Sequence, residues 1–124
     1  MNRPITTRMH GMTDYLMGPL LAVSPWLFGF AFGGPETIIP VILGVGMLLY
    51  SIFTDYETGL VRAIPMPMHL ALDAGSGLFL AISPWLFGFS NMVYLPHVIF
   101  GLLEVGAALM TQLHPTHANV LQRA

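Results

Sequence analysis

The stretch Ser24–Phe30 reads SPWLFGF, and the same seven letters return at Ser83–Phe89. Both tryptophans of the 124-residue chain lie inside these two copies. The match extends upstream, because Met9–Phe30 and Met68–Phe89 are identical at 13 of 22 positions when shifted by 59 residues. Agreement at this level indicates an internal duplication, which has to be recognised before a fold is assigned.

The duplicated unit contains a second apolar segment after the first. Val41–Gly44 reads VILG and resembles Val98–Gly101, VIFG, at a shift of 57 residues. We therefore predict a single domain made of two repeats, about residues 9–55 and 68–113, with short tails at residues 1–8 and 114–124. Each repeat supplies two apolar segments.

The composition indicates a membrane protein. Hydrophobic residues make up 55% of the chain and charged residues 8%, whereas soluble domains carry about 25% charged residues. A water-facing surface cannot be covered by so few charges, and the solvent should therefore be mostly lipid. Nucleic-acid binding is excluded as a function class, because the net charge is −2 and the cations form no cluster. The absence of cysteine excludes disulfides and thiolate chemistry.

The apolar segments have the length of membrane spans. A spanning helix needs about 20 mostly apolar residues. We predict an all-α integral membrane protein with four transmembrane helices. Because each repeat holds an even number of spans, the two hairpins form a tandem parallel repeat with a pseudo-two-fold axis along the membrane normal. The four spans are about Met9–Phe32, Ile38–Phe53, Pro67–Phe89 and Met92–Leu113.

The cations indicate the orientation. The chain has no lysine, and its four arginines lie before the first span, between the second and third, and after the fourth. With four spans, these three regions share one face, which the positive-inside rule places in the cytoplasm. We therefore expect a multi-pass protein of the cell (inner) membrane with both tails cytoplasmic. The arginines are Arg3, Arg8, Arg62 and Arg123.

Each heptapeptide contains the elements of an anchor and a kink. Its tryptophan should lie at the outer interface, where indoles are enriched. Its proline cannot bond the carbonyl four residues earlier, and in lipid a neighbouring serine hydroxyl can donate to that carbonyl instead. A ligand-facing aromatic cage is the alternative. Gly29 and Gly88, near the end of each heptapeptide, suit a helix end. The carbonyls in question belong to Leu21 and Leu80. The motif residues are Ser24, Pro25 and Trp26 in the first copy and Ser83, Pro84 and Trp85 in the second.

Two copies of Ser-Pro-Trp, each closing a span that opens with His and Asp, resemble the SPW-repeat family of small membrane proteins. The resemblance covers about Met9–Leu113, which is nearly the whole chain. It implies the membrane topology described above, and it brings no catalytic residues with it.

A His and an Asp are spaced i,i+4 at the start of each odd-numbered span, as His10 with Asp14 and His69 with Asp73. Such residues share a helix face. We expect Gly18 and Gly77 to let these two spans face each other, so that the four polar groups meet at the cytoplasmic end and hold the repeats together. The alternatives are N and O ligands to a transition metal, or two imidazoles to a haem iron. We expect no bound cofactor.

Glu104 is expected near the bilayer midplane, and its counterpart in the first repeat is Met47. Burial in hydrocarbon favours the neutral form of a carboxylic acid, so Glu104 is either a protonated acid hydrogen-bonded to a neighbouring helix or a proton-exchanging acid. His97 is expected as a solvated flank near the outer interface.

No catalytic motif is present, so the sequence favours a non-enzymatic structural or accessory membrane protein. Its expected partners are the lipid bilayer and further copies of the chain or a larger membrane complex. One alternative is an oligomeric proton-coupled transporter of small molecules that uses Glu104. The other is a membrane redox module that binds haem or quinone through His10 and His69.

Overall fold

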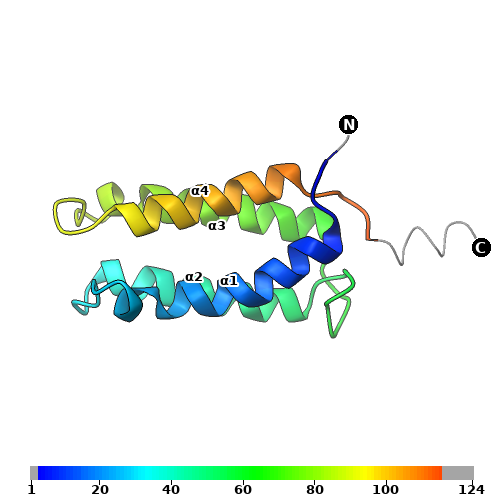
Figure 1. Ribbon diagram of the computed structural model, residues 1–124, viewed down its shortest axis with the longest axis horizontal. Coiled ribbons are helices and arrows are strands. Elements are labelled where there is room, and N and C mark those ends of the chain that lie inside the picture. Colours follow the sequence, from blue (N-terminus) through cyan, green and yellow to red (C-terminus); the bar gives the residue numbers. More distant parts are fainter. Residues whose placement is uncertain (1–2, 116–124) are drawn as a thin grey trace, which may run out of the picture.

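The computed structural model describes residues 3–115, which fold into four helices (Figure 1). No β-strand occurs among the described residues; isolated bridges join residues 5 and 111 and residues 54 and 64. The prediction of an all-α chain with four helices is confirmed over this range. Residues 116–124, which include Arg123 and most of the C-terminal tail, lie outside the described residues. The helices are α1 (Thr7–Leu27), α2 (Pro35–Ile52), α3 (Met66–Leu86) and α4 (Leu95–Met110).

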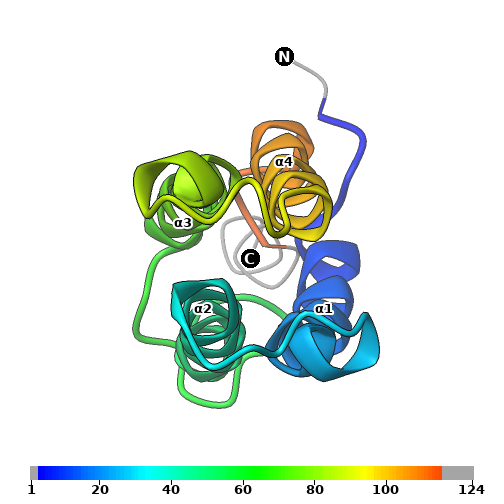
Figure 2. The ribbon, with the colours of Figure 1, turned by 90° about the vertical axis from the view of Figure 1, so that its left-hand side faces the viewer.

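The helices form two hairpins, α1 with α2 and α3 with α4, which correspond to the two repeats (Figures 1 and 2). Seen end-on in Figure 2, the helices occupy four corners, with α1 diagonally opposite α3. Packing is closest inside each hairpin and weakest, among neighbouring helices, between α1 and α4.

Glycines set the close approach inside each hairpin. A Cβ added at Gly44 of α2 would lie 2.6 Å from the Gly18 carbonyl oxygen of α1, and one added at Gly101 of α4 would lie 2.4 Å from the Gly77 carbonyl oxygen of α3. The expectation that Gly18 and Gly77 bring α1 and α3 face to face is therefore wrong. These glycines are used within the repeats, because the smallest side chains lie where two hairpin backbones nearly touch.

The heptapeptides close α1 and α3 as predicted. The Ser24 hydroxyl donates to the Leu21 carbonyl and the Ser83 hydroxyl to the Leu80 carbonyl, both at 2.7 Å. Each helix then ends at the leucine of the heptapeptide, and the glycine two residues later has a φ of 74°. Because that left-handed conformation stops a helix, α1 and α3 end earlier than the predicted Phe32 and Phe89.

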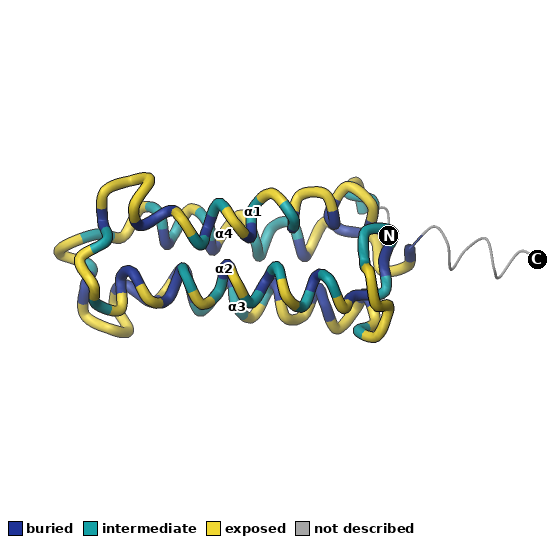
Figure 3. Tube along the Cα trace, turned by 90° about the horizontal axis from the view of Figure 1, so that it is seen from below, coloured by how far each residue is buried: buried dark blue, intermediate teal, exposed yellow. Residues whose placement is uncertain are grey.

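The distribution of side chains is inverted relative to a soluble bundle. Exposed positions run along all four helices (Figure 3). Large apolar side chains, chiefly leucine, isoleucine, valine and methionine, are exposed on all four helices, while most histidine, aspartate, serine and threonine side chains of the helices are buried. Trp26 is 63% exposed and Trp85 58% exposed, so neither lines an interior cage. By length and apolar character together, α2 is a candidate membrane span, and α4 is apolar but shorter.

The loop between α2 and α3 folds over the start of α1, at the end of the bundle where the N-terminal segment also lies (Figure 1). The Thr7 hydroxyl donates to the Glu57 carboxylate at 2.6 Å, and the Tyr15 hydroxyl donates to the Thr58 carbonyl at 2.8 Å. This loop covers the polar site described next.

Candidate functional site: a buried His–Asp cluster

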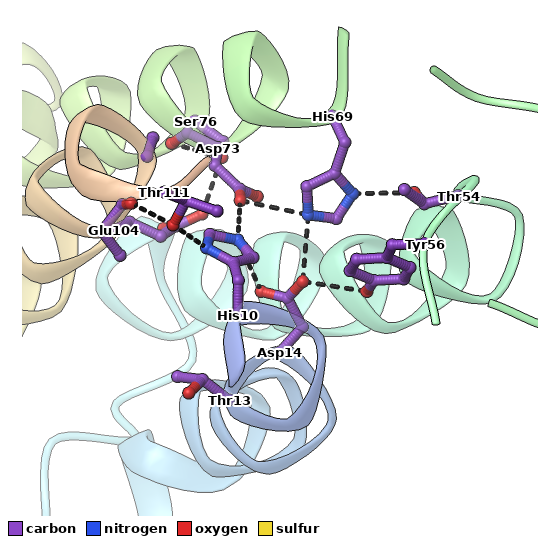
Figure 4. A network of polar contacts seen from close by, with 12 residues as sticks. His10, Thr13, Asp14, Thr54, Tyr56, His69, Asp73, Ser76, Glu104 and Thr111 are labelled. Carbon is purple, nitrogen blue, oxygen red and sulfur yellow. Dashed lines mark hydrogen bonds and ion pairs between the residues drawn. The ribbon is translucent and has the colours of Figure 1, made fainter. Parts of the chain in front are cut away.

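The four repeated polar residues His10, Asp14, His69 and Asp73 meet in one place, which we call the His–Asp cluster (Figure 4). The shortest contacts cross between repeats: His10 Nε2 lies 2.6 Å from Asp73 Oδ2, and His69 Nε2 lies 2.9 Å from Asp14 Oδ2. The contacts within each i,i+4 pair are longer, at 3.3 and 3.1 Å. The prediction that these groups meet is confirmed, although α1 and α3 are diagonal neighbours.

Two threonines fix the imidazole rings of the cluster. His10 Nδ1 lies 2.8 Å from the Thr111 hydroxyl, and His69 Nδ1 lies 2.7 Å from the Thr54 hydroxyl. Each hydroxyl donates its own hydrogen to the carbonyl four residues earlier, at 2.6 Å in both cases. The hydroxyl oxygens must therefore accept from the rings. Both Nδ1 atoms carry a hydrogen, and both Nε2 atoms face the carboxylates.

Each threonine contacts the histidine of the other repeat. Thr54 ends the first repeat and serves His69 of the second, while Thr111 ends the second repeat and serves His10 of the first. Isolated backbone bridges hold both threonines, Thr54 with Ile64 and Thr111 with Ile5. The two threonines are related by the 57-residue shift and the two isoleucines by the 59-residue shift, so the repeat governs this arrangement too.

Two tyrosines complete the shell without following the repeat. The Tyr56 hydroxyl donates to Asp14 Oδ2 at 2.9 Å, and the Tyr50 hydroxyl donates to Asp73 Oδ1. Burial, and secondarily the charge of Asp14, raises the pKa of Tyr56 above its ordinary value, so the hydroxyl stays protonated and donates. At the shift of 57 residues, alanine and leucine stand at the equivalent positions. Sequence reasoning found neither tyrosine.

His69 Nε2 differs from the equivalent atom of His10. His10 Nε2 forms a hydrogen bond to Asp73. His69 Nε2 is buried and lies close to both carboxylates, yet neither oxygen lies where a hydrogen on this atom would form a hydrogen bond. The cluster therefore contains one ring nitrogen that is near two oxygens and satisfied by neither.

A cavity of about 350 Å³ opens beside the cluster, where α1 and α4 pack least closely. Its lining is largely apolar, and its polar lining includes His10, Asp14, Asp73 and Glu104. Glu104 Oε1 accepts a hydrogen bond from the Ser76 hydroxyl of α3 at 2.9 Å, while Glu104 Oε2 is buried and has no partner. The expected hydrogen bond to a neighbouring helix is thus present, with Glu104 as the acceptor at Oε1.

The expectation that His97 is a solvated flank is wrong. The side chain is 1% exposed, and its Nε2 lies 2.9 Å from the Glu36 carbonyl oxygen of α2. The ring packs between Phe30 and Phe89, with centroid separations of 5.1 and 4.8 Å. His97 therefore joins the two hairpins at the end opposite the His–Asp cluster, a role that needs partners distant in sequence.

The fold and the site together define a tandem repeat of two helical hairpins that buries a His–Asp cluster and exposes many large apolar side chains. The chain belongs to the SPW repeat domain family, whose model matches residues 8–111. No curated protein and no solved structure was found to match the chain.

Proposed function

We propose that the chain is a four-span, non-enzymatic membrane protein of structural or accessory type, in which the His–Asp cluster joins the two repeats at the cytoplasmic end. The inverted side-chain distribution carries the membrane part of the proposal. Exposed leucine, isoleucine, valine and methionine side chains, which occur on all four helices as a group, are unfavourable in water and favourable in hydrocarbon. The family, a repeat of small membrane proteins, points the same way.

The helix lengths are compatible with four spans. At about 1.5 Å per residue, the 21 residues of α1 and of α3 cover about 31 Å, close to the ~30 Å hydrocarbon core. The 16 residues of α4 cover about 24 Å, and the Trp85 and Tyr94 rings, 5.9 Å apart, continue the apolar surface beyond its start. The mean hydropathy of α1 is reduced by residues that face inward, such as His10 and Asp14, and these do not meet lipid.

Reporter fusions test the topology. A reporter fused after residue 124 and another inserted at residues 33–36 should report opposite sides of the membrane, with the C-terminal fusion in the cytoplasm. Both reporters on one side would contradict the four-span arrangement. Extraction of the protein by detergent, and its resistance to extraction by alkaline carbonate, checks the membrane assignment separately.

The contact between His10 and Asp73 carries the structural part of the proposal, because it joins residues 63 apart in sequence and in different repeats. A double-mutant cycle of His10→Gln and Asp73→Asn measures it. We expect Asp73→Asn to lower the free energy of unfolding by on the order of 1 kcal/mol, as for interhelical hydrogen bonds in membranes. A coupling energy near zero would contradict the joining role.

The partners we propose are the bilayer and, through the apolar outer surface, further copies of the chain or a larger membrane complex. Cross-linking in native membranes followed by mass determination tests this. Only monomers at every cross-linker concentration would contradict it.

A second candidate function is proton-coupled transport through Glu104. The observation that favours it is the buried, unpartnered Oε2 atom beside the apolar cavity. In proteoliposomes loaded with a pH-sensitive dye, Glu104→Gln should abolish proton flux while leaving the helix content unchanged. Equal flux through the variant and the parent would remove Glu104 from any such pathway.

The haem alternative fits the cluster poorly. The His10 and His69 rings lie 5.4 Å apart between centroids at an interplanar angle of 81°, and their Nε2 atoms face Asp14 and Asp73. A porphyrin between the rings would have to displace both carboxylates. A Soret band in the optical spectrum of the purified protein would restore this alternative.

A further inference from the structure

We propose that the His–Asp cluster is a binding site for one divalent transition-metal ion of the zinc type, held by His10, Asp14, His69 and Asp73. This inference deepens the proposed joining role of the cluster, because the ion would draw two ligands from each repeat. It replaces the expectation that the cluster binds no cofactor.

The geometry of the donor atoms carries the proposal. Each of the four residues offers one nitrogen or oxygen, and these four atoms lie within 4.8 Å of one another. Around Zn²⁺, ligand bonds of about 2.0–2.1 Å in a tetrahedron place neighbouring donors about 3.3 Å apart. The Nε2 to carboxylate separations in the cluster are 2.6 and 3.1 Å to Asp73 Oδ2, 2.9 Å to Asp14 Oδ2 and 3.3 Å to Asp14 Oδ1. A small outward movement of side chains makes room for an ion.

The residues around the cluster have the arrangement that supports metal ligands. A metal-binding histidine usually donates its other ring N–H to a fixed acceptor, which orients the ring and selects the tautomer. Thr54 and Thr111 are such acceptors, and they hold Nδ1 so that Nε2 is turned inward. Ligating carboxylates are usually hydrogen-bonded in turn. Here the Tyr50 hydroxyl donates to Asp73 and the Tyr56 hydroxyl donates to Asp14.

The charges of the site match a dication. Two buried carboxylates require compensation, because an isolated charge is costly away from water. Without an ion, doubly protonated imidazoles supply it, as the two hydrogen bonds of the His10 ring require. Within residues 3–115, Asp14 and Asp73 form ion pairs with histidine and none with arginine. One dication balances two carboxylates while the imidazoles bind through neutral Nε2 atoms, displacing any hydrogens held there. The unsatisfied Nε2 of His69 is the atom that most directly points to a missing ligand.

The type of ion follows from the donors. Two imidazole nitrogens favour zinc, cobalt, nickel or copper over magnesium and calcium, which take oxygen ligands. Four protein ligands with no further donor suit a closed tetrahedral site of the structural kind. The cavity beside the cluster, lined by His10, Asp14 and Asp73, gives an ion a route to these atoms.

Cobalt(II) is the probe we choose, because tetrahedral Co²⁺ absorbs strongly in the visible range. The full chain, purified in detergent without a histidine tag and treated with a chelator, is titrated with Co²⁺ and then with competing Zn²⁺. We expect one Co²⁺ per chain with a tetrahedral spectrum, displaced by Zn²⁺. Elemental analysis of protein purified from cells should find zinc at the same ratio.

Variants separate a metal site from a merely polar core. Asp14→Asn and Asp73→Asn should each abolish the tetrahedral spectrum, while His114→Ala, a change at an exposed histidine outside the cluster, should leave it unchanged. Thr111→Val keeps all four ligands and should weaken Co²⁺ binding about 10- to 100-fold, the usual effect of losing a partner of a metal-bound histidine. Circular dichroism and gel-filtration volume report whether each variant is folded.

If the parent protein gives no tetrahedral Co²⁺ spectrum, the metal site is overturned. The metal site is equally overturned if folded Asp14→Asn and Asp73→Asn both bind Co²⁺ as the parent does, or if Thr111→Val binds it unchanged. The joining role is judged separately by the double-mutant cycle on His10 and Asp73, measured with chelator present. A coupling energy there without any metal binding would keep the proposed function and remove this inference.

Discussion

Replacing Gly44 with alanine tests how closely the helices of a hairpin approach. An added Cβ would lie 2.5 Å from the Ala22 nitrogen and 2.6 Å from the Gly18 carbonyl oxygen, and both are backbone atoms that no rotamer change can move. Ordinary contact begins at 3.4 Å, so α1 and α2 must separate by about 0.9 Å, a gap that forfeits a quarter to a half of each contact energy. Overpacking of this kind costs about 1–3 kcal/mol.

Gly46 is the matched control, because it lies in the same helix and an added Cβ would meet nothing within 4 Å. Alanine is favoured over glycine inside a helix by about 0.5–1 kcal/mol, and both substitutions share this gain. The difference in the free energy of unfolding between Gly44→Ala and Gly46→Ala therefore isolates the overpacking cost of about 1–3 kcal/mol.

The assay is titration of the purified protein with sodium dodecyl sulfate in mixed micelles, followed by far-ultraviolet circular dichroism. The second hairpin repeats the test, with Gly101→Ala against Gly106→Ala, since an added Cβ at Gly101 would lie 2.4 Å from the Gly77 carbonyl oxygen and one at Gly106 would meet nothing within 4 Å. Equal stability of the two variants in a pair would refute the close approach of the backbones.

The heptapeptides supply the remaining predictions. Quenchers at headgroup depth should quench Trp26 and Trp85 more than midplane quenchers do; the reverse order would place these exposed rings away from the interface. Ser83→Ala should lower the free energy of unfolding by about 1 kcal/mol, because the Leu80 carbonyl loses its 2.7 Å bond; unchanged stability would show that this carbonyl needs no partner. Gly88→Ala should cost about 1–2 kcal/mol at a φ of 74°, and a neutral result in the same titration would contradict the left-handed helix end.

The features that sequence reasoning predicted are those set by spacing along the chain. The serine bonds to Leu21 and Leu80 span three residues, so the position of the proline was enough to predict them. The meeting of the two His–Asp pairs followed from the duplication, because equivalent residues of a parallel repeat must lie at the same end of the bundle.

The features that it missed depend on which helices become neighbours. Gly18 indicates that another helix packs closely against α1, but not which one. The predicted neighbour was α3, and the observed neighbour is α2. Tyr56 lies in the loop between the second and third predicted spans, for which the sequence predicted no structure. Its contact with Asp14 depends on how that loop folds back over α1. Thr54 and Thr111 had a usable signal, since they are identical residues at the 57-residue shift that relates the second segments of the repeats.

Tyr50 and Ala107 occupy equivalent positions in the two repeats, and so do Met47 and Glu104. These differences between equivalent positions have a consequence for how such a protein diversifies. A homodimer of one hairpin would place every residue twice about its axis, so a mid-span acid or a tyrosine on one aspartate could not occur alone. Joining both hairpins in one polypeptide lifts that constraint, and each position beside the axis can change independently of its twin. The four residue types of the His–Asp cluster are the same in both repeats, whereas the tyrosines that bond the cluster and the neighbouring Glu104 each occur in one repeat only.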